Sequence, residues 1–423
     1  MNQNISTLNQ NIDSSKNLNS ARLMIFELSA GGHYPEYLTH LINYWQQNDY
    51  GNLFLVISNQ FSQKHPEVVE LASDCISFIF ITPQEEQSLP IANSTKKRIV
   101  RAFQEFELAA KYARKLQATE ILFTYLDTRQ IPLAVGKKLP CSCSGIYFRS
   151  RFHYGKLTKD KADWRENFLR WQEKLLLQLA LKNAQLKYIF SLDPFAIKYF
   201  PTLPPGVQAI ALPDPVAIDS NIVNNFLELK ASLGIESQRK TFLLFGGLTR
   251  RKGILPLLDA LHTLSPKLGQ KICLLLVGSI SKEFQQLIQP KIECARQVNA
   301  VQIISEYRYV SETETRQYFQ LADFVLALYQ RHVGMSGIIL RAAAAHKPIL
   351  SSNYGLMGEI TRRYRLGLTV DSTKPQEIAT GLRQLLTKSP EKFMDGDRAK
   401  QFVLQNSPSN FARTIFKHLH TAQ

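Results

Sequence analysis

The chain has 423 residues, which predicts two or three domains because single hydrophobic cores stop growing near ~250–300 residues. Hydrophobic residues make up 44% and aromatic residues 10% of the sequence, which excludes a collagenous, low-complexity or largely disordered chain. Lys and Arg number 51 against 35 Asp and Glu, and the net charge of +16 indicates an acidic partner: nucleic acid, an anionic membrane or a phosphorylated small molecule. The excess is uneven, since residues 93–187 carry 20 basic and 8 acidic side chains whereas residues 1–92 carry 3 and 9.

The first 21 residues are rich in Asn, Gln and Ser and contain no apolar segment, so we expect a disordered tail over 1–21 and no signal peptide. No stretch approaches the ~20 apolar residues of a membrane span, and we expect a cytoplasmic protein. The five cysteines lack metal-ligand spacing, and Asp395-Gly396-Asp397 lies in a polar segment. Neither a bound metal nor a cofactor is therefore predicted.

Apolar runs alternate with helical patterns from Arg22 onward. Such alternation predicts an α/β architecture built on a parallel sheet. In the first half, strands are predicted over residues 23–28, 53–58, 76–81, 121–125, 143–148 and 188–191, and helices over 37–45, 68–73, 96–116 and 164–183.

A proline-rich stretch over 201–215 interrupts the pattern, and we expect an extended linker at 212–216. The alternation then restarts, which predicts two doubly wound, Rossmann-like domains over 22–212 and 213–405. A final helix within 406–423 is expected to pack back on the first domain. In the second half, strands are predicted over 241–245, 272–277, 323–328 and 348–351, and helices over 254–264, 313–321, 337–345, 375–386 and 408–420.

A glycine turn separates the first predicted strand from the first helix, with the sequence Ser29-Ala30-Gly31-Gly32-His33. Gly31 and Gly32 would let backbone N–H groups approach an anion, and His33 could act as a base or a phosphate donor. A tight turn with a structural histidine explains the same residues equally well. The turn is not GxGxxG, which disfavours a nicotinamide cofactor.

The second half repeats this arrangement with three cations in the turn. Gly247 is followed by Arg250, Arg251 and Lys252, which suit a diphosphate, although a solvated basic loop has the same composition. Further on, Ser336 and Gly337 precede an alanine-rich helix whose first N–H groups could face a ligand. The alanines also fit a helix packed closely on the sheet.

Taken in this order, the three segments resemble a GT-B-fold glycosyltransferase of the large retaining family 4, the glycosyl transferases group 1. Residues 246–253 match the family's G-R-L-x-x-x-K-G turn, and residues 336–348 match its E-G-F-G-x-x-x-x-E-A-m-A-x-G-x-P stretch. The first half matches in architecture and in the Gly31-Gly32-His33 turn. The resemblance implies a cleft between the domains for a nucleotide-diphospho-sugar, and sugar transfer with retention to a sugar, lipid or other acceptor.

The resemblance also implies residue roles. Arg250, Arg251, Lys252 and the N–H groups after Ser336 would stabilise the departing nucleoside diphosphate, so that no metal ion is needed. Departures from the family lie in the same region. Val333 and Arg341 stand where members usually carry two glutamates, and an arginine cannot accept a hydrogen bond from a ribose. Gly247 replaces the arginine of the turn, and Glu359 matches the glutamate of the later G-G-x-P-E stretch; both are assigned, with Arg341, to the donor site.

An acceptor site is predicted from the first half. Arg149, Arg151, His153 and Tyr154 follow a predicted strand, and this mixture suits an anionic or sugar acceptor. Asp127 follows the preceding strand, and with His33 and His153 it completes the candidate catalytic residues. A basic loop with packed aromatic rings is the alternative.

Two predicted helices carry basic and apolar residues side by side. Lys96-Lys97-Arg98 begins one helix, and Trp164, Phe168 and Trp171 lie on the other. Such surfaces fit peripheral attachment to an anionic membrane on its cytoplasmic face, or a solvated helix. The chain carries no nucleic-acid-binding signature, so no nucleic acid partner is expected. The favoured function is sugar transfer; the alternative is a catalytically inactive GT-B-like binding or scaffold protein.

Overall fold

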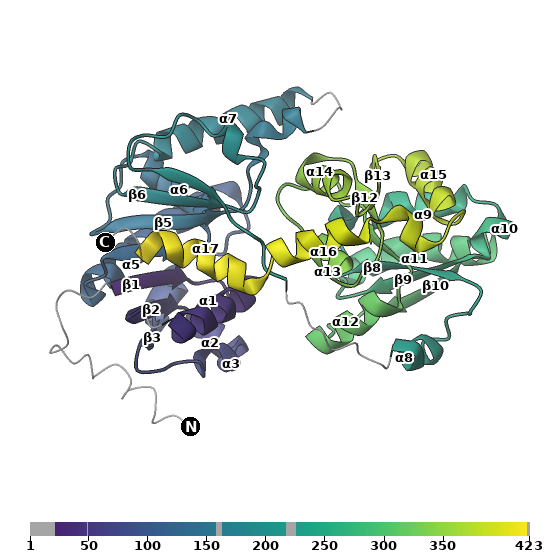
Figure 1. Ribbon diagram of the computed structural model, residues 1–423, viewed down its shortest axis with the longest axis horizontal. Coiled ribbons are helices and arrows are strands. Elements are labelled where there is room, and N and C mark those ends of the chain that lie inside the picture. The colour runs from purple at the N-terminus through teal and green to yellow at the C-terminus, as the bar shows by residue number, and fades with distance from the viewer. Residues whose placement is uncertain (1–21, 49, 158–162, 217–225, 421–423) are drawn as a thin grey trace. The chain divides into compact units, whose positions relative to one another are not determined.

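The computed structural model describes residues 22–48, 50–157, 163–216 and 226–420, and the tail predicted over 1–21 lies outside them (Figure 1). The chain forms two compact units. Of the described residues, unit 1 contains those within 22–152, 164–213 and 408–420, and unit 2 contains 153–157, 163, 214–216 and 226–407. Residues 153–157 thus group with unit 2, which differs from the continuous first domain predicted over 22–212.

Unit 1 is built on a seven-stranded sheet in the order β3-β2-β1-β4-β5-β6-β7, and every neighbouring pair is parallel. The inner strands are largely buried on both faces because helices cover them, as parallel sheets require, whereas the edge strands β3 and β7 are mostly half-buried or exposed. Their bounds are β1 (Arg22–Glu27), β2 (Asn52–Ile57), β3 (Ile76–Phe80), β4 (Glu120–Phe123), β5 (Ser142–Tyr147), β6 (Leu186–Ser191) and β7 (Gln208–Ala211).

Strand β7 lies within the proline-rich stretch over 201–215, where no strand was predicted. The prolines lie on either side of 208–211, so all four of these residues keep the N–H groups that a strand needs. They pair with β6 at the edge of the sheet, in the register Tyr188 to Gln208 through Ser191 to Ala211.

The helices of unit 1 include one that comes from the far end of the chain. Helix α17 lies on α1, where the rings of Tyr37 and Phe411 are 4.8 Å apart and those of Trp45 and Phe416 are 5.0 Å apart. The proline-containing α6 was not predicted. The helices are α1 (Tyr34–Asn48), α2 (Asn59–Lys64), α3 (Pro66–Val69), α4 (Pro83–Ser88), α5 (Thr95–Leu116), α6 (Leu126–Ala134), α7 (Trp164–Ala180) and α17 (Pro408–His420), with 3-10 turns η1 (Arg151–Lys156) and η2 (Ile197–Tyr199).

Unit 2 has a six-stranded parallel sheet in the order β10-β9-β8-β11-β12-β13. Its strands are β8 (Lys240–Phe245), β9 (Ile272–Val277), β10 (Gln302–Glu306), β11 (Phe324–Ala327), β12 (Ile349–Ser352) and β13 (Gly367–Val370). Its helices are α8 (Phe226–Ser232), α9 (Ile254–His262), α10 (Pro266–Gly269), α11 (Lys282–Gln297), α12 (Glu312–Leu321), α13 (Gly337–Ala344), α14 (Gly355–Arg363), α15 (Pro375–Leu385) and α16 (Gly396–Gln405), with 3-10 turns η3 (Arg250–Lys252) and η4 (Pro390–Phe393).

Each sheet has one point where the strand order reverses: between β1 and β4 in unit 1, and between β8 and β11 in unit 2. Loops leave opposite faces of the sheet there, which opens a crevice at the carboxyl ends of the strands. The predicted glycine turns after β1 and β8 both lie at these points, so each unit has a candidate site at the carboxyl edge of its own sheet.

Candidate functional site

A buried lysine joins two chain segments at the carboxyl edge of the unit 2 sheet. Lys252 is 6% exposed, and its Nζ donates to the carbonyl oxygen of Phe245 at 2.8 Å and to Tyr329 Oη at 2.5 Å. Phe245 ends β8 and Tyr329 follows β11, so the ammonium group ties together the two strands of the reversal point. Burial lowers the pKa of Lys252 because a charged ammonium is poorly solvated there.

The glycines of this turn have different roles. Gly253 has φ 75°, and a Cβ there would lie 2.2 Å from the carbonyl oxygen of Leu328, so a side chain is excluded. Gly246 has φ 95°, and a Cβ would lie 3.2 Å from Lys252 Nζ. Gly247 faces open space, with nothing within 4 Å of a Cβ position, so a ligand could approach its backbone.

Hydroxyl groups surround Tyr329. Ser336 Oγ donates to Tyr329 Oη at 3.1 Å, and Ser372 Oγ donates to the carbonyl oxygen of Tyr329 at 2.9 Å. Ser336 occupies the N-cap position of α13 with extended backbone, but its side chain makes no capping hydrogen bond. The Ser336 hydroxyl donates its hydrogen bond to Tyr329 instead of capping the helix. Gly337, the first residue of α13, has open space at its Cβ position.

The two arginines of the turn are exposed, unlike Lys252. Arg251 Nη1 lies 3.0 Å from His332 Nδ1, and its guanidinium is 5.2 Å from the Tyr329 ring centroid. The Arg250 guanidinium lies 5.9 Å from the Phe284 ring centroid. Of the three cations predicted to act together, Lys252 is therefore buried, whereas Arg250 and Arg251 face solvent.

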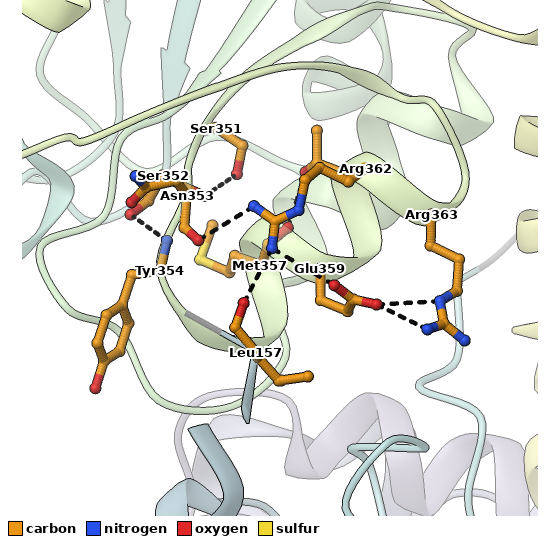
Figure 2. A network of polar contacts seen from close by, with 10 residues as sticks. Leu157, Ser351, Ser352, Asn353, Tyr354, Met357, Glu359, Arg362 and Arg363 are labelled. Carbon is orange, nitrogen blue, oxygen red and sulfur yellow. Dashed lines mark hydrogen bonds and ion pairs between the residues drawn. The ribbon is translucent and has the colours of Figure 1, made fainter. Parts of the chain in front are cut away.

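Arg341 and Glu359, the other predicted donor residues, are both ion-paired. Arg341 forms a short ion pair with Glu312 of α12. Glu359 accepts from Arg363 Nη2 at 2.8 Å and lies 3.5 Å from Arg362 Nη2, as Figure 2 shows. A ligand that uses Glu359 as an acceptor would compete with these two arginines.

Tyr154 belongs to unit 2 and is fully buried. Its hydroxyl accepts from the Gly334 N–H at 2.9 Å, and its ring packs so closely on Gly355 that a Cβ there would lie 2.3 Å from Cε2. The Tyr354 ring centroid is 5.6 Å away. Tyr154 therefore braces the loops that precede α13 and α14, whereas the sequence suggested an acceptor contact.

The edge of unit 1 contains a buried carboxylate that sequence analysis missed. Glu27 is the last residue of β1; it accepts from the Ser29 N–H at 2.5 Å and forms a short hydrogen bond with Thr124, which follows β4. Burial raises the pKa of Glu27 to about 7, against the opposing effect of these hydrogen bonds. The sequence signal that could have identified this residue is a single acid, Glu27, directly after the apolar run of residues 23–26.

Asp127 lies in the first turn of α6, and both of its carboxylate oxygens accept backbone hydrogen bonds. The N–H groups of Phe148 and Arg149 donate to it at 2.9 Å each, which fixes the chain after β5. Burial raises the pKa of Asp127 to about 6. Asp127 therefore joins α6 to the end of β5, and its side chain also lies at the predicted edge.

His33 stands in a group of aromatic rings. Its ring stacks on Phe148 with centroids 4.8 Å apart, and Tyr37 and Tyr34 lie at 4.7 and 4.8 Å. The rings desolvate the imidazole and lower its pKa although the residue keeps an exposed edge, so the neutral form dominates at pH 7. Gly31 and Gly32 beside it are exposed, with nothing within 4 Å of either Cβ position.

The predicted acceptor residues do not share one unit. Arg149 and Arg151 lie in unit 1, where Arg151 Nε pairs with Glu173 of α7 at 3.1 Å. His153, which is buried, groups with unit 2 together with Tyr154. Among the described residues, no group of three or more His, Cys, Asp or Glu side chains could hold a metal ion. Asp395 caps α16 by accepting from the Arg398 N–H at 3.1 Å.

Comparisons with known proteins agree with this architecture. Residues 239–388 match the family described as "Glycosyl transferases group 1". The sequence matches none of the curated proteins. Sucrose-phosphate synthase from Thermosynechococcus elongatus superposes with a TM-score of 0.67 at 13% identity, over 95% of this chain and 100% of that one. Anabaena HepE in complex with UDP and glucose gives a TM-score of 0.64 at 12% identity, over 95% and 100%.

A third structure, the α,α-trehalose 6-phosphate synthase of Burkholderia multivorans, gives a TM-score of 0.67 at 12% identity, over 95% of this chain and 97% of that one. At such identities the likeness establishes the fold. The predicted fold class and the resemblance of the second half are thereby confirmed.

Proposed function

We propose that this chain, which has the GT-B fold and whose residues 239–388 match the glycosyl transferases group 1, moves a sugar from a nucleotide-diphospho-sugar to an acceptor. The observation that carries the proposal is the buried Lys252 at the reversal point of the unit 2 sheet. The UDP and glucose bound in the Anabaena structure support the donor class. Retention of configuration, metal independence and a cytoplasmic location belong to the same proposal.

The donor diphosphate is proposed to lie at the carboxyl edge of β8 and β11. Lys252 holds positive charge there before the reaction begins, and Arg250 and Arg251 extend into solvent beside it. Open space at Gly247 and Gly337 lets backbone N–H groups approach phosphate oxygens. Preorganised positive charge stabilises the leaving diphosphate without reorganisation at the moment of reaction.

The acceptor is proposed to bind at the carboxyl edge of unit 1. Asp127 and Glu27 are carboxylates whose pKa values lie near neutrality, and His33 is a neutral imidazole. Such groups can accept a proton from a sugar hydroxyl. Arg149 and Arg151 are proposed to contact an anionic part of the acceptor.

Isothermal titration with UDP and with GDP tests the donor site. We expect wild type to bind at least one of them, and Lys252→Met to weaken binding about tenfold or more, since a charge-assisted hydrogen bond contributes ~1.5–3 kcal/mol. Lys240→Ala is the matched control: Lys240 is the first residue of β8, at the end of the strand opposite to the turn that carries Lys252, and it pairs with Asp323 at 3.2 Å. Absence of nucleotide binding in wild type would favour the inactive scaffold protein, and equal binding by Lys252→Met would remove the lysine from the site.

A further inference from the structure

The side of helix α7 that faces the rest of unit 1 carries the acidic residues of the helix. Glu166 and Arg170 form a short ion pair in which both side chains are largely buried. Glu173 accepts from Tyr147 Oη at 2.8 Å and pairs with Arg151 at 3.1 Å. Both acids of the helix are thus engaged on its inner side, where Leu177 and Ala180 are the buried apolar residues.

The outer side of α7 is apolar. At 100° per residue, five large apolar side chains with spacings of four, three, four and four fall within a stripe about 80° wide. These residues are Trp164, Phe168, Trp171, Leu175 and Leu179, with exposed fractions of 73%, 53%, 58%, 38% and 38%. Soluble helices usually place such a stripe against the core, and an exposed one of this size indicates an interaction surface.

The charges beside the stripe are positive. Arg165 and Lys174 are exposed, and the helical spacing places them on opposite flanks of the stripe. Helix α5 begins, like α7, at the carboxyl edge of the sheet, because each helix leads into a parallel strand. Its first turns expose Lys96, Lys97 and Arg98 together with Ile99 and Val100.

We propose that the apolar stripe of α7, with Arg165 and Lys174 on its flanks, docks on the surface of an anionic lipid bilayer. Tryptophan, phenylalanine and leucine on one side with cations beside them suit a helix lying in the lipid interface. No helix among the described residues is long and apolar enough to cross a membrane, so α7 would lie along the bilayer surface. A second copy of the chain fits less well, because a two-fold contact would bring the same cations face to face.

The docking stripe is connected to predicted acceptor residues. Arg151, the ion-pair partner of Glu173, follows β5 two residues after Arg149. Membrane docking would therefore hold this loop near the bilayer. The inference itself does not depend on the donor chemistry and can be tested without any substrate.

Flotation with lipid vesicles is the direct experiment. We expect the full chain to float with vesicles of phosphatidylcholine mixed with phosphatidylglycerol, and not with phosphatidylcholine alone, and added salt should weaken the binding. Tryptophan emission gives a second measurement, since the chain has three tryptophans and Trp45 is buried. A blue shift on adding the mixed vesicles would report on Trp164 and Trp171.

Variants locate the surface. Phe168→Gln with Trp171→Gln should reduce vesicle binding at least about a hundredfold, because each aromatic side chain buried in the lipid interface contributes about tenfold or more. Arg165→Gln with Lys174→Gln should weaken binding to the mixed vesicles by about thirtyfold, because each cation near an anionic lipid surface contributes about fivefold. Tyr309→Gln, which removes an aromatic residue that is 87% exposed in unit 2, is the matched control and should change nothing.

The possible results distinguish a lipid bilayer from a second copy of the chain as the partner of this surface. No binding to mixed vesicles, equal binding to both vesicle types, or binding unchanged by the aromatic double variant would each overturn the proposal. Self-association in sedimentation that Trp171→Gln abolishes, without vesicle binding, would assign the stripe to a second copy and also overturn it. All variants replace exposed residues, so unchanged melting temperatures and UDP or GDP titrations are expected and would separate this test from that of the donor site.

Discussion

The carboxyl edges of the two sheets have the same topology and opposite chemistry. Strand order reverses beside β1 in unit 1 and beside β8 in unit 2, and a glycine turn follows each of these strands. Unit 1 places the buried carboxylate of Glu27 and the half-buried carboxylate of Asp127 there, whereas unit 2 places the buried ammonium of Lys252. The fold thus determines where a site can form, and a few side chains decide which charge it accepts.

The largest expected effect concerns the cation of unit 2. Lys252→Ala should slow sugar transfer, or hydrolysis of the donor, by about 10²–10³-fold, as removal of one preorganised donor does elsewhere. Mass spectrometry of the products measures both reactions, with Lys240→Ala as the control. Equal rates in Lys252→Ala and wild type would show that the buried cation of unit 2 has no role in the reaction, and would contradict the proposed difference between the two edges.

The glycine turns should differ in their tolerance of a side chain. Gly253→Ala combines a φ of 75° with a Cβ 2.2 Å from a backbone oxygen, so we expect a loss of about 3 kcal/mol or more in unfolding free energy. Gly32→Ala, with φ 72° and open space, should cost only about 1–2 kcal/mol. Urea denaturation measures both, and Gly247→Ala should be close to wild type. Equal losses at Gly253 and Gly32 would show that the backbone contact does not matter.

Asp127→Ala tests whether the carboxylate edge of unit 1 is also structural. The substitution leaves the N–H groups of Phe148 and Arg149 without their acceptor, which should cost about 2–3 kcal/mol in unfolding free energy. Asp127→Asn retains one acceptor oxygen and should lose about half as much. Chemical denaturation against the exposed Asp74→Ala gives the comparison. A loss no larger than that of Asp74→Ala would contradict the bracing role.

The smallest effect is a pH dependence at Glu27. Burial raises its folded-state pKa from 4.5 to about 7, so the folded protein retains a proton that the unfolded chain releases between these pH values. The contribution of this group to stability is therefore fully present below about pH 4.5 and falls as pH rises through 7. Glu27→Gln should stabilise the protein by about 1–3 kcal/mol at pH 8 and by little at pH 4.5. Urea denaturation at both pH values checks this; the same difference at each would contradict it.

Local patterns predicted the long elements of the fold well. The predicted helices over 96–116 and 337–345 correspond to α5 (Thr95–Leu116) and α13 (Gly337–Ala344), because their polar and apolar residues follow helical spacing. The weaker elements escaped prediction. Helix α6 contains Pro132, α11 contains Pro290, and β7 lies between prolines. Because proline disfavours both helices and strands, the local sequence argues against these elements, and tertiary packing stabilises them.

The sequence by itself determined the α/β class, the two parallel sheets, the places of the two glycine turns and the resemblance of the second half to the glycosyl transferases group 1. All of these depend on residues close together along the chain. Only the tertiary structure decided that Lys252 is buried against Tyr329, that Glu27 is buried at the edge of unit 1, and that Tyr154 braces the loops of unit 2. It also decided that the aromatic residues of α7 face solvent. These features join residues far apart in sequence, and burial and pKa depend on neighbours that only the folded chain brings together.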